Sequence, residues 1–290
     1  MYTKQALREL GVTPDTLTRD QKQQLEDLGF FIVEDVLSKD ALRSMRSEFE
    51  RIHAQEAGQG GHEVHVEPGA RRVSNIFNKS EAFDPCLALP HALAASAHLL
   101  GEIKLHGANL RDPVQGYGQQ DLHVDVPKRF ADDWWVVNTM VMFDDMTLNN
   151  GPTRVVPGSQ WWAPINVPVT NQADWEPVPL TPEDQARVPA DLGAPYPGEV
   201  LVEAPAGAAI ICNSAMWHSG TVKKDNTYRR MLHLTYTRRD LPQQLIQLDH
   251  LTQPLYDRMS PVQRYLMEIE PPGVAGVVRK PHRESKGWWN

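Results

Sequence analysis

The sequence predicts a mainly β fold with flanking α-helices gathered on its N-terminal side. Two textures along the chain indicate this architecture. The first hundred residues hold capped segments with helical spacing, whereas from about Lys104 onward short runs of β-branched and aromatic residues alternate with turn sequences. The sequence has no internal repeat and no linker-like break, so we expect one domain over residues 1–290, with a core at about 18–270.

The chain opens with a well-marked helix and a short strand. Thr18 with Gln21 three residues later forms a capping-box signature, and the helix Arg19–Leu28 that it begins is followed by Gly29, a residue typical of helix ends. The next four residues, Phe30–Val33, are apolar and are predicted to form a strand.

Two further helices are expected before the strand-rich region. Ser38 can cap a helix over Lys39–His53, in which Met45 and Phe49 have helical spacing. The Ala- and Leu-rich segment Pro90–Leu100 predicts another. The segment Gln55–Gly69, rich in Gly, His and Glu, is predicted to be a loop.

The remaining two thirds of the chain predict strands joined by turns and one long insert. The predicted strands are Trp134–Phe143, Val200–Glu203, Ala208–Cys212 and Arg229–Thr237. The insert Ala163–Gly198 is rich in proline and has little periodicity, and loops of this length are usually functional or disordered. A short helix is expected over Ser260–Ile269, followed by a Pro-, Gly- and base-rich tail.

Composition excludes several classes of partner. With a net charge of −8 and a pI near 5.8, the chain is a poor candidate for a general nucleic-acid or membrane-surface binder. No apolar run reaches the length of a membrane span, and the first residues lack a signal-peptide core. Because Cys86 and Cys212 make neither a disulfide framework nor a zinc ligand set, we expect a reducing, cytoplasmic setting.

The motif His123-Val-Asp125 is the most informative feature for function. In an extended strand, residues i and i+2 point the same way, so both side chains could reach one ion while Val124 packs behind them. A His-x-Asp pair alone more often lies in an exposed loop or forms a local hydrogen bond between the imidazole and the carboxylate. However, His218 follows 95 positions later and Arg229 another 11 positions on. Two imidazoles and one carboxylate on one face of a metal form the facial triad of non-haem Fe(II) oxygenases.

The wider context of these residues resembles a known family, the phytanoyl-CoA dioxygenase-like group of Fe(II)/2-oxoglutarate-dependent oxygenases. The resemblance extends from about Thr18 to about Leu266. It is carried by Gln120 before the His-x-Asp motif, Asn150-Gly-Pro-Thr153 leading to Pro157-Gly-Ser159, His218-Ser-Gly220, and Arg229.

The resemblance implies a double-stranded β-helix, or jelly roll, with Fe(II) held by His123, Asp125 and His218. It also implies that the protein uses 2-oxoglutarate and O2 to oxidise a small organic molecule by hydroxylation, desaturation or rearrangement. Secondary metabolites are the substrate class expected by analogy. Halogenating relatives replace the metal carboxylate with a small residue, so the presence of Asp125 favours oxygenation. Gln160 departs from the His that often follows Pro-Gly-Ser, which we expect to alter packing and not metal binding.

Two neighbouring arginines compete for the distal carboxylate of 2-oxoglutarate, which a planar, permanently charged guanidinium suits. In a strand, Arg229 shares a face with Met231 and His233, and Arg230 points the other way. Alternation does not decide between the faces. The resemblance places the anchor 11 residues after the distal His, which selects Arg229.

Three more residues are cosubstrate candidates by resemblance. Gln120 and, with less support, Asn75 could bind the C1 carboxylate, and Thr153 could offer a hydroxyl. Ordinary loop or turn roles are the alternative for each. We expect His233 to be a core histidine, and His62 and His65 to face solvent.

The substrate pocket is harder to assign. Phe77, Trp134, Met140 and Trp217 could line an apolar pocket, although such side chains more often fill the core. The segments Gln55–Gly69 and Ala163–Gly198 could close over the site as a lid.

Two other functions fit part of the sequence. A cupin-type metalloenzyme that ignores 2-oxoglutarate would keep the three ligands but would not need Arg229. A catalytically silent jelly-roll binding protein would need neither, and the intact triad argues against it.

Overall fold

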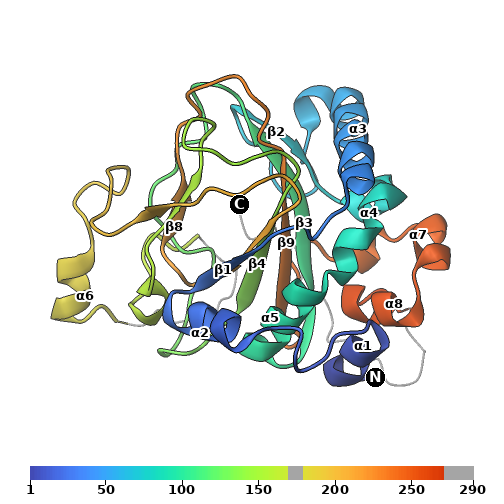
Figure 1. Cartoon of the computed structure of the whole chain (residues 1–290), viewed down its shortest axis with the longest axis horizontal. Helices are drawn as coiled ribbons and strands as arrows, with labels where there is room; N and C mark the ends of the chain where they lie inside the picture. The colour runs from blue at the N-terminus through green and yellow to red at the C-terminus, as the bar shows by residue number, and fades with distance from the viewer. Residues whose placement is uncertain (169–178, 271–290) are drawn as a thin grey trace.

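Two antiparallel sheets face each other, as the computed structural model, which describes residues 1–168 and 179–270, shows (Figure 1). The major sheet has the strand order β1 (Phe30–Val33), β7 (Ala209–Asn213), β4 (Val136–Met142), β9 (Met231–Arg238), β3 (Ile103–Pro113) and β2 (Ala70–Val73). The minor sheet has the order β6 (Val200–Leu201), β5 (Thr153–Val155) and β8 (His218–Gly220).

Most helices pack together against the outer face of the major sheet, to the right and below in Figure 1. They are α1 (Thr3–Glu9), α3 (Lys39–Glu56), α4 (Ile76–Lys79), α5 (Pro90–Leu100), α7 (Gln253–Arg258) and α8 (Pro261–Met267), with α2 (Arg19–Asp27) below β1. α6 (Pro182–Arg187) lies apart, beyond the minor sheet. Short 3₁₀ turns complete the order: η1 (Ala57–Gln59), η2 (Glu81–Ala88), η3 (Ser159–Trp161) and η4 (Gln247–His250). No helix in the described part of the chain is long and apolar enough to cross a membrane.

Because side chains alternate along the strands, the outer face of the major sheet is apolar and its inner face carries polar side chains. In β9, Leu232, Leu234 and Tyr236 are fully buried in the large apolar core under the helices. The intervening Met231, His233 and Thr235 point between the two sheets and line a cavity. Because side chains alternate with a period of two, this one register fixes which residues can reach the site.

A β-bulge in β3 brings an additional histidine to the inner face. The pairing with β9 shifts between Leu105 and Gly107, so that His106 is the extra residue and its side chain lines the cavity. Beyond the bulge, Asn109 and Arg111 also line it. Bulges are common next to functional sites because they redirect a side chain without ending the strand.

Local signals in the sequence predicted the elements well. The capping box of Thr18 and Gln21, the strand Phe30–Val33 and the helix Pro90–Leu100 are confirmed. The helix capped by Ser38 continues to Glu56, three residues further than predicted.

The insert Ala163–Gly198 is not without structure, which corrects the prediction for that segment. Its helix α6 is capped by Thr181, whose hydroxyl accepts a hydrogen bond from the backbone of Asp184 in a second capping box. Residues 169–178 of the insert and the predicted C-terminal tail from 271 onward lie outside the described residues. Val200–Glu203 forms a strand only over Val200–Leu201.

The buried side chains on the outer face of β9 should contribute strongly to the free energy of unfolding. Leu234 has no exposed surface and sits on a central strand, so Leu234→Ala is expected to lower the free energy of unfolding by about 2–5 kcal/mol through lost burial and the cavity left behind. Leu148→Ala, at a leucine that is 47% exposed, is the control and should change it by less than about 0.5 kcal/mol. Urea unfolding followed by circular dichroism measures both, and equal effects would contradict this packing.

Candidate active site

The His-x-Asp segment is held by backbone hydrogen bonds to β8 and not by a regular strand. His123 forms an isolated bridge with His218: each backbone N–H donates to the other's carbonyl, at 3.0 and 2.9 Å. The Asp125 N–H donates to the Ser214 carbonyl at 3.1 Å. The predicted continuous strand is therefore absent, but the bridge still places His123 and Asp125 on one side, with Val124 buried behind them as predicted.

The three predicted ligand side chains converge. The Nε2 atom of His218 lies 3.4 Å from Oδ1 of Asp125, and Nε2 of His123 lies 3.9 Å from the same oxygen. One ligand atom from each of the three residues can be chosen so that all lie within 4.8 Å of one another. Their side chains are 15%, 22% and 16% exposed for His123, Asp125 and His218, and all three line the cavity.

Backbone carbonyls orient both imidazoles. Nδ1 of His123 is 2.7 Å from the Asp121 carbonyl, and Nδ1 of His218 is 2.8 Å from the Met216 carbonyl. A carbonyl can only accept, so each Nδ1 carries a proton, and each ring turns its Nε2 toward Asp125. Support of this kind is what metal-ligating histidines require.

The electrostatics of the three groups suit a divalent cation. Burial, with a contribution from His218, lowers the pKa of His123 to about 4. Burial works against ionisation of Asp125, but His218 and His123 hold the pKa of its carboxyl well below the usual range. Burial also opposes protonation of His218, yet the Asp125 carboxylate outweighs it and raises that pKa. The site is thus an anionic carboxylate between two imidazoles, a donor set that Fe(II) accepts.

The cavity beside these residues has a volume of about 260 Å³ and lies between the two sheets. Gln120 and Thr153, both predicted from the sequence, line it. The Oε1 atom of Gln120 accepts a hydrogen bond from the backbone of Gly220 at 3.0 Å, and the Thr153 hydroxyl lies 3.6 Å from Sδ of Met140.

Arg229 is buried behind this cavity without a carboxylate partner. It has no exposed surface, its Nη1 lies 3.5 Å from Sδ of Met231, and its Nε and Nη2 have no hydrogen-bond partner among the described residues. Burial and the nearby Arg111 lower its pKa to about 9, which leaves the guanidinium charged at neutral pH. A buried, unpaired charge of this kind is costly unless a ligand completes it.

Arg230, the rival, is already paired on the opposite face. It binds Asp144 at 2.7 Å and Glu50 at 2.9 Å. The choice of Arg229, made from its spacing after the distal His in the family, therefore agrees with the placement of both side chains.

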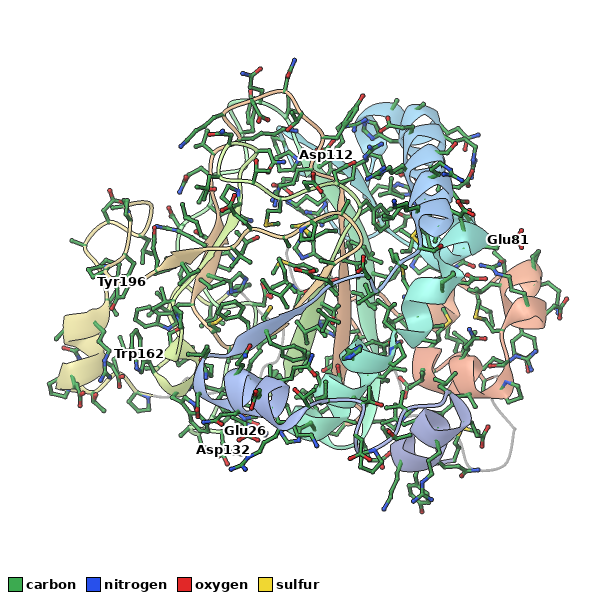
Figure 2. All side chains as sticks on the ribbon, in the orientation of Figure 1. Glu26, Glu81, Asp112, Asp132, Trp162 and Tyr196 are labelled. Carbon is green, nitrogen blue, oxygen red and sulfur yellow. The ribbon has the colours of Figure 1, made fainter. Side chains whose placement is uncertain are left out.

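Asp112 holds the backbone at Arg229 in place. Its carboxylate accepts from the Arg229 backbone N–H at 2.9 Å, from Arg71 at 2.6 Å and from Lys223 at 3.3 Å. It lies in the upper part of the molecule in Figure 2, where β2 begins and β3 ends.

Several predicted residues are not brought to the site. Asn75 adopts a left-handed backbone conformation at the start of α4, and its side-chain oxygen accepts from Asn78, so it does not line the cavity. Phe77, Trp134 and Trp217 lie in apolar clusters, and of the predicted pocket residues only Met140 lines the cavity.

Other residues line the cavity although the sequence did not single them out. His65, predicted to face solvent, lines it together with Glu67, Arg72, His106 and Arg111. His233, predicted to be a core histidine, also lines it, with Nδ1 3.3 Å from the Asn138 amide nitrogen. Strand alternation could have indicated Arg111, but the loop carrying His65 and Glu67 gave no signal for the cavity.

The insert supports the ligand segment from behind. The N–H of Leu122 donates to the Leu192 carbonyl at 2.9 Å, and that of Val124 to the Ile165 carbonyl at 3.2 Å. Trp162 and Tyr196, on the minor-sheet side in Figure 2, pack against Trp217. The described residues of the insert position His123 and do not line the cavity.

Comparison with known proteins places this geometry in a family. Residues 25–231 match the family described as Phytanoyl-CoA dioxygenase (PhyH). The chain belongs to this family. The resemblance inferred from the sequence is thus confirmed.

Relatives and solved structures agree with this assignment. The chain is 28% identical over 159 residues to ectoine dioxygenase from Bordetella bronchiseptica, covering 51% of each protein. It spans about half the length of that relative. It is also 28% identical over 230 residues to dioxygenase af480 from Aspergillus fumigatus, covering 75% of this chain and 66% of that protein.

Two solved structures share the fold. HygX from Streptomyces hygroscopicus, with nickel and 2-oxoglutarate bound, aligns with a TM-score of 0.60 at 19% identity, over 78% of this chain and 89% of HygX. EctD from S. alaskensis, with bound Fe, aligns with a TM-score of 0.59 at 19% identity, over 78% of this chain and 79% of EctD. The predicted double-stranded β-helix is confirmed.

Proton competition at His218 should make metal binding depend on pH. Because Asp125 raises the pKa of His218 above 6.5, a metal must displace a proton near neutral pH, and affinity falls as the pH is lowered through that pKa. Calorimetric titration with Ni²⁺ should show a weaker apparent affinity at pH 6 than at pH 8. His123, with a pKa of about 4, adds nothing in this window. Equal affinities at the two pH values, with the fold intact by circular dichroism, would contradict this account.

Proposed function

We propose that this chain acts as a single Fe(II)- and 2-oxoglutarate-dependent dioxygenase domain, with its core at about residues 18–270. It oxidises a small organic molecule, with a secondary metabolite as the expected substrate class. His123, Asp125 and His218 hold the iron. The observation that carries the proposal is the combination of this triad with Arg229, a buried guanidinium that has no partner among the described residues.

The residues present fit both groups. Two neutral imidazoles and a carboxylate form a 2-His-1-carboxylate set, which leaves other coordination positions open for ligands. Arg229, behind the cavity, offers its unpaired Nε and Nη2 to the distal carboxylate of 2-oxoglutarate, while Thr153 and Gln120, which line the cavity, offer further polar contacts. When bound, iron and 2-oxoglutarate supply oxidising power through decarboxylation of the 2-oxo acid coupled to O2.

The rest of the chain contributes position and exclusion of water. The bridge between His123 and His218 keeps the two imidazoles together, and Asp112 keeps Arg229 aimed inward. Met140 and Met231 form an apolar wall beside the polar groups, which strengthens the ion pair that Arg229 can make. The structural relative HygX, which was solved with nickel and 2-oxoglutarate, supports the same choice of cosubstrate.

Arg229 favours this function over a cupin-type metalloenzyme, which would have no use for a buried, unpaired guanidinium. Succinate formation from 2-oxoglutarate in the presence of Fe(II) and ascorbate tests the proposal. A metalloenzyme of another kind would bind iron without making succinate, and a silent binding protein would do neither. We also propose a cytoplasmic location, supported by the free thiols of Cys86 and Cys212.

Replacing a triad member should remove the metal. His218→Ala is expected to reduce bound Ni²⁺ from one ion per chain to less than about a tenth, because two ligands cannot hold the ion tightly. Metal analysis after dialysis measures this directly. His65→Ala is the matched control, since His65 lines the same cavity without belonging to the triad. Full metal content in the His218 variant would refute the assignment.

Substitutions of Arg229 and Arg230 should have different effects on 2-oxoglutarate binding and on stability. Arg229→Gln is expected to weaken 2-oxoglutarate binding to the Ni²⁺-loaded protein by about 2–5 kcal/mol, because the ligand loses its charge-assisted partner. It should not lower the melting temperature of the ligand-free protein, since this guanidinium has no carboxylate partner to lose.

Arg230→Gln should behave in the opposite way. It breaks the pairs with Asp144 and Glu50, so the melting temperature should fall while 2-oxoglutarate affinity stays within about twofold. Calorimetry and thermal unfolding report the two effects. A reversed pattern would show that Arg230 is the anchor.

A further inference from the structure

Besides Arg229, two further arginines lie close to the site. Arg72 and Arg111 line the cavity together with Glu67 and form a charged cluster with it. Arg72 in β2 lies directly opposite Arg111 in β3 in the sheet register, so both side chains reach the same end of the inner face. Glu67, three residues before β2, accepts from Nε of Arg111 at 2.9 Å and from Nη1 of Arg72 at 2.7 Å. Among the described residues, neither arginine forms an ion pair with any other carboxylate.

The cluster keeps donors free toward the cavity. Nη1 of Arg111, and Nε and Nη2 of Arg72, make no hydrogen bond within residues 1–168 and 179–270. None of these nitrogens is sealed from solvent in the way that Nε and Nη2 of Arg229 are. Since both residues line the cavity, their unused donors are available to a molecule inside it.

The balance of charge separates this cluster from the proposed cosubstrate site. A divalent metal and Arg229 together carry three positive charges, and Asp125 with doubly charged 2-oxoglutarate carries three negative charges, so that half of the site is neutral when loaded. Arg72 and Arg111 share the single carboxylate of Glu67 and leave one positive charge over. Burial lowers the pKa of Arg72, Glu67 opposes this, and the nearby Arg111 adds a smaller lowering.

We propose that Arg72 and Arg111 form a second anion subsite, which binds the carboxylate of the primary substrate. This inference rests on the proposed function and adds the substrate class: a small organic acid with a single negative charge. A planar carboxylate matches paired guanidinium donors, and one charge completes the balance. His65, Asn109 and Gln244 line the cavity as well, so the remainder of the substrate meets polar groups in addition to the apolar wall of Met140 and Met231.

The test compares acids with neutral molecules of the same shape. The Ni²⁺-loaded protein, saturated with 2-oxoglutarate, is titrated by calorimetry with benzoate, cyclohexanecarboxylate and N-acetylglycine, and with the primary amide of each. We expect at least one acid to bind at least tenfold more tightly than its amide. Arg111→Gln and Arg72→Gln should each remove about tenfold of that affinity, and Arg111→Lys should retain part of it.

A control variant and a measurement of 2-oxoglutarate affinity distinguish the possible outcomes. Arg43→Gln removes an exposed arginine whose one ion pair among the described residues is with Asp40, and it should leave acid binding unchanged. 2-Oxoglutarate affinity should stay within about twofold in the Arg72 and Arg111 variants. If it falls instead, these arginines serve the cosubstrate and the inference is wrong. It is also wrong if no acid binds the wild type better than its amide, a comparison that needs no variant. Failure of the wild type to bind 2-oxoglutarate at all would refute the proposed function itself.

Discussion

The reciprocal pair of backbone hydrogen bonds between His123 and His218 is the contact on which the site depends. It joins a loop after β3 to the strand β8 and so brings together two imidazoles separated by 95 positions in the sequence. Neither residue belongs to the major sheet, so the pairing of the major strands alone would not hold them. The carbonyls of Asp121 and Met216 then set the ring orientations. The backbone bridge and the two carbonyl contacts therefore position Nε2 of each ring without the help of a metal.

Support for this contact comes from the side opposite the cavity. Val124 and Trp217 are fully buried in one apolar cluster, and the insert covers them by accepting from the Val124 backbone through Ile165 and from the Trp217 indole through Ala163. Rigid packing behind a ligand pair limits its movement, which is the condition for holding a metal in a fixed geometry. The insert that the sequence suggested as a lid thus has a structural task in its described part. Its role at the cavity remains a prediction.

Local chemistry explains which features could be predicted. Helix caps, the short strand Phe30–Val33 and the two-residue period of β9 depend on neighbouring residues, and all three follow from the sequence. The inward direction of Arg229 needed one more fact, its spacing from His218. Features set by distant pairing were missed. The opposition of Arg72 and Arg111 depends on the β2–β3 register, and His106 reaches the cavity through a bulge that no sequence signal marks. His65 is exposed, as predicted, but its place beside the cavity was missed because a Gly-rich loop carries no periodicity to show which way it folds.

Unpaired positive charge gives the cavity its physical character. Arg229 is buried without a carboxylate, and Arg72 and Arg111 share one, so the ligand-free protein holds like charges together in a place where water screens them poorly. Such an arrangement lowers the stability of the empty state, and an anion that enters relieves it. The free energy released therefore adds to ligand affinity without any further contact. It also discriminates among organic ligands, because beside these arginines a neutral molecule of the same shape relieves nothing and an organic cation adds to the repulsion. A cavity built in this way selects its ligands first by charge and then by fit.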